Sequence, residues 1–181
     1  ASMSRYENFA HGWVKAAADV VPFAYSVQAV SGIGVVKNAV DFGTPTLSTK
    51  TMPKIHRRVL QTVDLDDFVA TETPNLIVVY IGSNDYTNIF PPSAKTFGDA
   101  YAKMVRSIRA QYNTTVSVLH VCRGDHPQCA PIRAFANASD VDHYTDTFDG
   151  DTPTSGCIGH RGAEQQKALA GKMATVIKSL L

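Results

Sequence analysis

The run from Asn75 to Ile81 constrains the fold of this chain more than any other stretch. Leu-Ile-Val-Val-Tyr-Ile follows Asn75 without the polar alternation of a half-exposed strand. Continuous apolar, β-branched runs of this kind are typical of strands in a parallel sheet that is covered by helices on both faces. Gly82-Ser83-Asn84-Asp85 follows and ends the run. We therefore expect a buried parallel strand here, with a polar turn directly after it.

The rest of the chain alternates between helix-like and strand-like segments. Apolar spacing and capping residues predict helices over 7–20, from 51 to about 60, over 96–112 and over 163–180. β-prone runs predict strands over 23–30, 115–121 and 141–148. This alternation predicts an α/β fold with a mainly parallel sheet and one domain over 1–181. Ligand sites in such sheets lie beyond the carboxyl ends of the strands.

The composition fits one globular domain and disfavours some partners. The 181 residues are 44% hydrophobic, with a formal net charge of +1. No basic stripe indicates a nucleic-acid partner. No apolar run has the length that crosses a bilayer, and no signal peptide precedes the first expected helix. We expect neither a nucleic-acid partner nor a membrane span.

The cysteines and two glycosylation sequons bear on where the protein works. Cys122 and Cys129 flank a polar loop, which a short disulfide could close or which could hold free thiols, and the sequence leaves both open. Cys157 is a third thiol. The sequons Asn113-Thr-Thr115 and Asn137-Ala-Ser139 favour a secreted protein if a eukaryote makes it.

The remaining polar residues do not predict a metal site. The histidines that lack pairwise metal-ligand spacing are His11, His56, His120, His126 and His143. We interpret His120 as a core or edge residue of its strand. The acidic residues from Asp140 to Asp151 lack the ligand order of a calcium loop, so we interpret this stretch as a solvated loop.

Three short blocks carry residue types suited to acyl transfer. They are Ser31-Gly32-Ile33-Gly34, then Gly82-Ser83-Asn84-Asp85, and late in the chain Ser155-Gly156-Cys157-Ile158-Gly159-His160. A hydroxyl nucleophile needs an imidazole to take its proton. The oxygen that becomes negative needs fixed N–H donors.

The order of these blocks resembles the SGNH, or GDSL, hydrolases. The resemblance implies a three-layer α/β/α, flavodoxin-like fold with His160 as catalytic base. It also implies that the Asn84 amide and a backbone N–H of the glycine block, at Gly32 or Gly34, hold the oxyanion. Asp85 then supports the turn by hydrogen bonds.

Within that group, the chain is most similar to the carbohydrate esterases of family 2. The similarity rests on 7–13, on Thr51-Met52-Pro53, and on Gly156-Cys157 before His160. It implies removal of acetyl groups from polysaccharides by a Ser-His dyad, with no cofactor. Cys157 stands where other SGNH enzymes have an Asp three residues before the His, so a backbone carbonyl would orient the imidazole. Gly159 and Arg161 depart from the Trp and Pro that often flank that His, which leaves the substrate preference open.

The nucleophile has two candidate sources. Enzymes of this group begin with a central strand followed by Gly-Asp-Ser, whereas this chain opens Ala1-Ser2-Met3-Ser4. Either Ser2 is the nucleophile, or a companion polypeptide or N-terminal fragment supplies the apparently missing central strand together with its Gly-Asp-Ser. Unpaired backbone groups in a dry interior are costly, which favours a supplied strand.

The sequence predicts an esterase acting on acetylated carbohydrate and leaves two alternatives. One is a catalytically inactive relative that binds carbohydrate. The other is an esterase for lipid or small aryl esters. Tyr86, next to the Asn-Asp turn, could either stack on a sugar ring or be buried.

Overall fold

The computed structural model describes residues 10, 12–39, 50–58, 71–87, 89–112, 116–147 and 160–181. The chain divides into two compact units. One unit combines both chain ends, Ala1–Ser26 and Asp149–Leu181, and the other is Val27–Phe148. The prediction of one domain over 1–181 stays a prediction.

The central unit contains a parallel sheet of three strands within the described residues. The strands are β1 (Leu76–Val79), β2 (Ser117–Cys122) and β3 (His143–Asp146), in the order β1-β2-β3. Both pairs are parallel, with Val79 beside His120 and His120 beside Tyr144. The predicted α/β class with a parallel sheet is confirmed, as are the strands predicted over 75–81, 115–121 and 141–148, with β2 ending one residue later than predicted.

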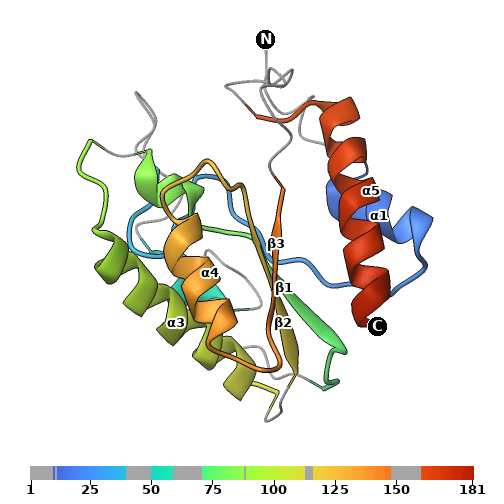
Figure 1. The fold of residues 1–181 in the computed structure, drawn as a ribbon, viewed down its shortest axis with the longest axis horizontal. Helices are drawn as coiled ribbons and strands as arrows, with labels where there is room; N and C mark the ends of the chain where they lie inside the picture. Colours follow the sequence, from blue (N-terminus) through green and yellow to red (C-terminus); the bar gives the residue numbers. More distant parts are fainter. Residues whose placement is uncertain are drawn as a thin grey trace. The chain divides into compact units, whose positions relative to one another are not determined.

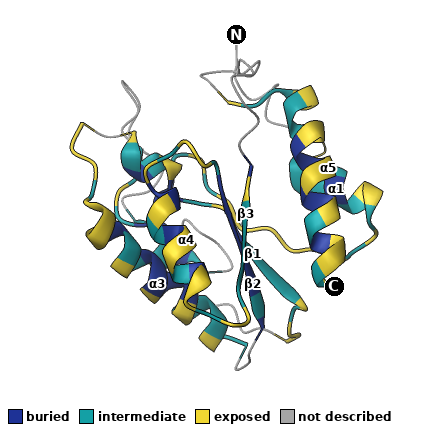
Figure 2. Cartoon of the chain, in the orientation of Figure 1, coloured by how far each residue is buried: buried dark blue, intermediate teal, exposed yellow. Residues whose placement is uncertain are grey.

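Helices α3 (Ala94–Ala110) and α4 (Cys129–Asn137) lie side by side against one face of this sheet (Figure 1). Phe97 and Tyr101 of α3 and Ile132 of α4 pack with Val118 of β2 in the main core. Leu119 and Val121, which alternate with Val118 and so point to the opposite face, are also fully buried. Figure 2 draws most of β2 as buried. The pattern of a strand buried on both faces therefore belongs to β2.

Strand β1 is less buried than its sequence predicts. Leu76, Ile77 and Val78 are half-buried, and only Val79 is buried. Within the described ranges β1 pairs with β2 alone, so its other edge carries no neighbouring strand. The apolar run gives the strand correctly, but complete burial also needs a partner on each side.

The prediction of a strand over 23–30 is wrong. These residues are described, they form no strand, and those from Ala24 to Ala29 are exposed. β-prone side chains alone do not make a strand, because the backbone must also find a neighbour to complete its hydrogen bonds.

Helix α4 is a feature that our sequence analysis did not predict. It begins at Cys129 directly after the polar loop, and no side chain caps its start. The available signals were Pro131 in the first turn and the spacing of Ile132, Phe135 and Ala136. In contrast, α2 (Met52–Ile55) follows Thr51 and carries Pro53, as expected for a helix start, but ends after one turn.

The unit of the chain ends pairs two helices. Helix α1 (Trp13–Val20) packs against α5 (Ala163–Leu180) through Ala17, Ala170 and Ala174, whose small side chains let the backbones approach closely. The bounds of α5 agree with the predicted 163–180. The part of the predicted 7–20 helix before Gly12 falls mainly on residues outside the described ranges. Among the described helices, none is long and apolar enough to cross a membrane.

Candidate active site

Gly82 starts the turn that follows β1. Its φ of 117° lies in the left-handed region, which favours glycine. A Cβ at this position would lie 2.7 Å from the ring of Phe97, so the close packing of α3 also requires glycine. The chain then forms a 3₁₀ turn over Ser83–Tyr86, which carries Asn84 and Asp85 at the carboxyl end of β1.

The glycine block forms a second turn, in which its two glycines have different functions. Gly32 has φ of 73°, so it reverses the chain direction where other residues are strained. Gly34 is required by crowding, since a Cβ there would lie 1.8 Å from the Lys37 carbonyl oxygen and 2.7 Å from Asp85 Oδ2. The sequence predicted a glycine turn here, but not this contact with Asp85.

Asp85 joins the two turns. Its carboxylate is fully buried and accepts hydrogen bonds from three consecutive backbone N–H groups. Val35 N donates to Oδ2 at 2.9 Å, and Val36 N and Lys37 N donate to Oδ1 at 2.6 and 2.9 Å. A buried carboxylate needs such donors, and these fix the glycine block against the turn after β1.

Asn84 lies beside the glycine block. Its side-chain Nδ2 donates to the carbonyl of Ile33 at 2.8 Å, which fixes the orientation of the amide. A carboxamide carries two N–H donors, so this contact uses one of them. The structure thus brings together Gly32, Gly34, Asn84 and Asp85, as the block order implied.

The two glycine N–H groups differ in their partners. Gly34 N donates to Asn38 Oδ1 at 3.0 Å, and the Asn38 side chain in turn donates to the Lys50 carbonyl. No described residue accepts a hydrogen bond from Gly32 N–H. Of the two glycines, Gly32 is therefore the better candidate to bind an oxyanion.

The other predicted site residues belong to the unit of the chain ends or fall outside the described residues. His160 is exposed, three residues before the start of α5, and belongs to the unit of the chain ends. The start of α5 is capped without it, because Gly162 N donates to Gln165 Oε1 at 3.0 Å. Ser2 and Cys157 lie outside the described residues. The catalytic roles of these residues stay predictions.

Tyr86 packs inward. Its ring meets Phe97 edge to face, with 5.6 Å between centroids, and its hydroxyl is buried without a hydrogen-bond partner. Burial, with Asp85 nearby, raises the pKa of Tyr86. Of the two interpretations of this residue, the structure favours the buried aromatic.

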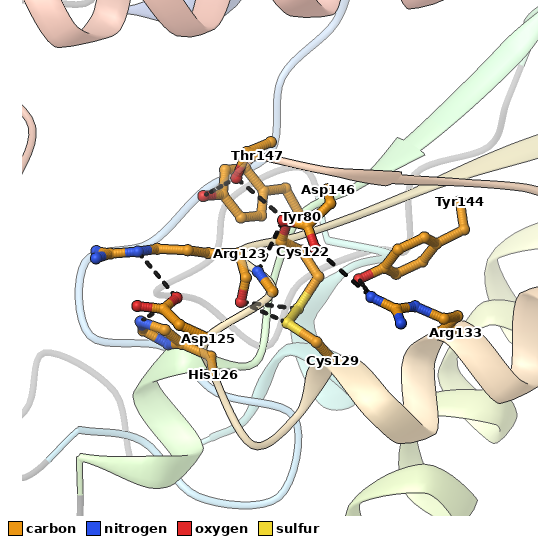
Figure 3. Close-up of a disulfide and its surroundings, with 11 residues drawn as sticks. Tyr80, Cys122, Arg123, Asp125, His126, Cys129, Arg133, Tyr144, Asp146 and Thr147 are labelled. Atoms are coloured by element: carbon orange, nitrogen blue, oxygen red, sulfur yellow. Dashed lines mark hydrogen bonds and ion pairs between the residues drawn. A yellow bond between two sulfur atoms is a disulfide. The ribbon is translucent and has the colours of Figure 1, made fainter. Parts of the chain in front are cut away.

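A disulfide between Cys122 and Cys129 closes the polar loop after β2 (Figure 3). The loop is also tied to the end of β3, since Gly124 N donates to Asp146 Oδ1 at 2.8 Å and Thr147 N to the Cys122 carbonyl at 2.7 Å. Gln128, at the end of the loop, packs its stem against Gly82. Through Gln128, the loop that the bridge closes lies next to the turn that carries Asn84.

Removing this bridge should lower stability without unfolding the protein. For the Cys122→Ala/Cys129→Ala variant we expect the free energy of unfolding to fall by about 2–3 kcal/mol, the chain-entropy value for so short a loop. Urea unfolding measures it. Reductant should lower the free energy of unfolding of the wild type and leave that of the variant unchanged. Identical unfolding of the wild type with and without reductant would contradict the bridge.

A buried polar network lies between α3 and the sheet. The Tyr101 hydroxyl is 2.7 Å from His120 Nδ1, His120 Nε2 is 3.6 Å from Asp142 Oδ2, and Arg109 pairs with Asp142. Burial raises the pKa of Tyr101, so its O–H stays protonated. With the Asp142 carboxylate facing Nε2, the ring proton belongs on Nε2, and Nδ1 accepts from the Tyr101 O–H. The interpretation of His120 as a core residue is confirmed. The Asp142 side chain is fully buried, so the solvated-loop interpretation is wrong at this position, where Arg109 compensates the charge.

The state of His120 should make stability depend on pH. Burial lowers its pKa, against the opposing pull of Asp142, while Arg109 and His143 lower it further. As pH falls below about 6.5, the unfolded chain takes up a proton that the folded chain resists, so stability falls. In urea unfolding between pH 7.5 and 5.5, His120→Gln should lose less stability than the wild type. The surface variant His126→Gln is the control, and equal slopes for His120→Gln and wild type would contradict this account.

The comparisons with known proteins agree with this geometry. The α/β fold with its parallel sheet matches the fold of solved SGNH structures. A family model for GDSL-like lipases and acylhydrolases matches residues 5–175, and the chain belongs to that family. No curated protein matches the chain.

Several solved structures share the fold. A carbohydrate esterase family 2 enzyme with a carbohydrate-binding domain from Corynascus thermopiles (Myceliophthora fergusii) superimposes with a TM-score of 0.78 at 21% identity, covering 96% of this chain and 57% of that chain. A family 2 carbohydrate esterase from Clostridium thermocellum in complex with cellohexaose superimposes with a TM-score of 0.79 at 17% identity, covering 97% of this chain and 55% of that chain. An acetyl xylan esterase from Butyrivibrio proteoclasticus superimposes with a TM-score of 0.76 at 12% identity, covering 97% of this chain and 56% of that chain. The chain therefore spans about half the length of each of these structures.

Proposed function

We propose that the protein is a serine-type esterase that removes O-acetyl groups from carbohydrates. The observation that carries the proposal is the pairing of Asn84 with the glycine block through Ile33, with Asp85 fixing both turns. Membership of the GDSL family supports ester hydrolysis. The carbohydrate substrate is supported by neighbours described as carbohydrate esterases, one of them bound to cellohexaose.

The proposed mechanism uses a Ser-His dyad. A serine hydroxyl, from Ser2 or a supplied segment, attacks the acetyl carbonyl carbon while His160 takes its proton. The carbonyl oxygen becomes negative and accepts hydrogen bonds from Asn84 Nδ2 and Gly32 N. Collapse of this intermediate expels the sugar oxygen, which takes the proton from His160. His160 then deprotonates a water that hydrolyses the acyl-serine and releases acetate. Because Cys157 stands where other SGNH enzymes have an Asp, we propose that a backbone carbonyl orients the imidazole of His160.

A companion strand is the second part of the proposal. Strand β1 pairs with β2 alone within the described ranges, although its four residues are all apolar. An open apolar edge is a template for a further strand. We propose that this edge is covered by a companion polypeptide, or by an N-terminal fragment, that carries the nucleophile. Denaturing mass spectrometry of the native protein should then find either a second peptide or a chain with more residues than these 181.

We propose that the protein is secreted. The Cys122–Cys129 disulfide is typical of oxidising compartments. Asn137 of the sequon is exposed at the end of α4, where a glycan could be attached if a eukaryote makes the protein.

Carbohydrate binding without hydrolysis is the second candidate function. One solved neighbour is described as having an active site with divergent catalytic and non-catalytic binding functions. Fluorophosphonate labelling of the native protein, followed by peptide mapping, separates the two candidates. A labelled serine supports the esterase and locates its nucleophile. A folded protein that binds oligosaccharide but is not labelled would instead be a binding protein.

A further inference from the structure

The segment Ile89-Phe90 exposes two large apolar side chains beside the candidate site. Ile89 is 82% exposed and Phe90 is 77% exposed, more than any other large hydrophobic residue in the described part of the chain. Single exposed apolar residues are common on protein surfaces. Two in sequence, five and six residues after Asn84, need a further explanation.

The backbone of this segment is fixed although its side chains are uncovered. Before it, Thr87 Oγ1 donates to the Asn84 carbonyl at 2.9 Å. After it come Pro91 and Pro92, whose rings restrict the chain, and then Ser93, which caps α3 by accepting from Thr96 N at 3.1 Å. The exposed side chains of Ile89 and Phe90 therefore project from a backbone that is held on both sides.

Lys37 connects the Ile89-Phe90 segment to the candidate oxyanion site. Its Nζ donates to the Phe90 carbonyl at 2.6 Å, while its backbone N donates to Asp85 Oδ1 at 2.9 Å. Asp85 also holds Val35 and Val36 in the glycine block. Lys37 thus joins Phe90 to the hydrogen bonds with which Asp85 holds the glycine block.

We infer that Phe90 is a specificity-determining residue that contacts a sugar ring of the carbohydrate chain bearing the acetyl group. This inference rests on the proposed function. An aromatic face attracts the weakly positive C–H groups on the flat side of a pyranose ring, as it does other positive edges. A sugar chain extends past the reacting ester, so a residue near the Asn84 turn can contact a sugar ring while the oxyanion donors hold the acetyl carbonyl. Two adjacent apolar side chains make a smaller contact than the extended apolar face with which helices bind lipid surfaces, which favours a sugar ring as the occupant.

The test compares Phe90→Ala with wild type in binding and in catalysis. We expect its affinity for xylohexaose, cellohexaose or mannohexaose, whichever binds wild type best, to fall about tenfold by calorimetry. The KM for acetylated xylan should rise by a similar factor, with kcat and the hydrolysis of 4-nitrophenyl acetate unchanged. Phe90→Tyr should restore binding. Val20→Ala, which removes an exposed apolar side chain from α1, should match wild type.

Three outcomes would overturn the inference, and they differ from failure of the proposed function. Wild-type oligosaccharide affinity in Phe90→Ala would overturn it. So would an equal loss of turnover of acetylated xylan and of 4-nitrophenyl acetate in Phe90→Ala, which would indicate a disturbed oxyanion site. If Phe90→Ala lost binding to phosphatidylcholine vesicles but kept its sugar binding, the Ile89-Phe90 segment would be a lipid contact. If wild type binds no oligosaccharide and hydrolyses no acetylated xylan, the carbohydrate substrate itself is wrong, and the inference falls with it.

Discussion

Replacing His160 by alanine is expected to abolish hydrolysis of acetyl esters. Without an imidazole, the serine hydroxyl keeps its proton and the leaving sugar oxygen receives none, so kcat should fall by at least about a thousandfold. Asn84→Ala should retain the dyad but lose one oxyanion donor, and lower kcat by about 10²–10³. Initial rates with 4-nitrophenyl acetate and acetylated xylan measure both variants.

The matched control is His126→Ala, the same substitution at a histidine of the disulfide loop, which should retain wild-type turnover. Both histidine variants should unfold in urea like the wild type, because His160 is exposed and α5 is capped by Gln165. Unchanged turnover in His160→Ala would reject its role as base. Equal loss in Asn84→Ala and His160→Ala, together with lower stability, would mean that both changes disturb the fold.

Local patterns in the sequence predicted most of the elements of the central unit. The β-branched run before Gly82 gave β1, and spacings of three and four residues gave α3. Helix α4 was missed because it is short, begins with Cys129 and has no capping side chain, so its start looks like loop. The strand over 23–30 was wrong because propensity does not supply a hydrogen-bonding neighbour.

The contacts that build the candidate site could not be predicted from local patterns. The sequence places Asn84 and Asp85 after a strand and Gly32 and Gly34 in a turn. However, the bonds that join Asp85 to Val35, Val36 and Lys37 connect residues about fifty positions apart. Likewise, nothing near Asp142 in sequence indicates that Arg109 would let it be buried. Such pairings depend on how distant segments pack in three dimensions, which local spacing along the chain does not encode.

Asp85→Ala is expected to be the most destabilising single change in the candidate site. It would leave three buried or part-buried N–H groups, of Val35, Val36 and Lys37, without their acceptor. At about 1–3 kcal/mol for each unsatisfied donor, the free energy of unfolding should fall by roughly 3 kcal/mol or more. Because the glycine block would also lose its attachment to the Asn84 turn, turnover should fall at temperatures where the variant is still folded. Urea unfolding and hydrogen exchange at residues 33–38 measure the two effects.

A second variant tests the same contact from the other side. Gly34→Ala places a methyl group 2.7 Å from Asp85 Oδ2 and against the Lys37 carbonyl, so it should loosen the same amides while the carboxylate remains. The control is Asp99→Asn, which breaks an exposed pair with Lys95 and should change stability by less than about 0.5 kcal/mol. Faster exchange at residues 33–38 in both site variants, but not in the control, would show that Asp85 acts by holding the glycine block. If Asp85→Ala lowers turnover while exchange and stability match the wild type, the carboxylate takes part in the reaction itself, and its assignment as a support is wrong.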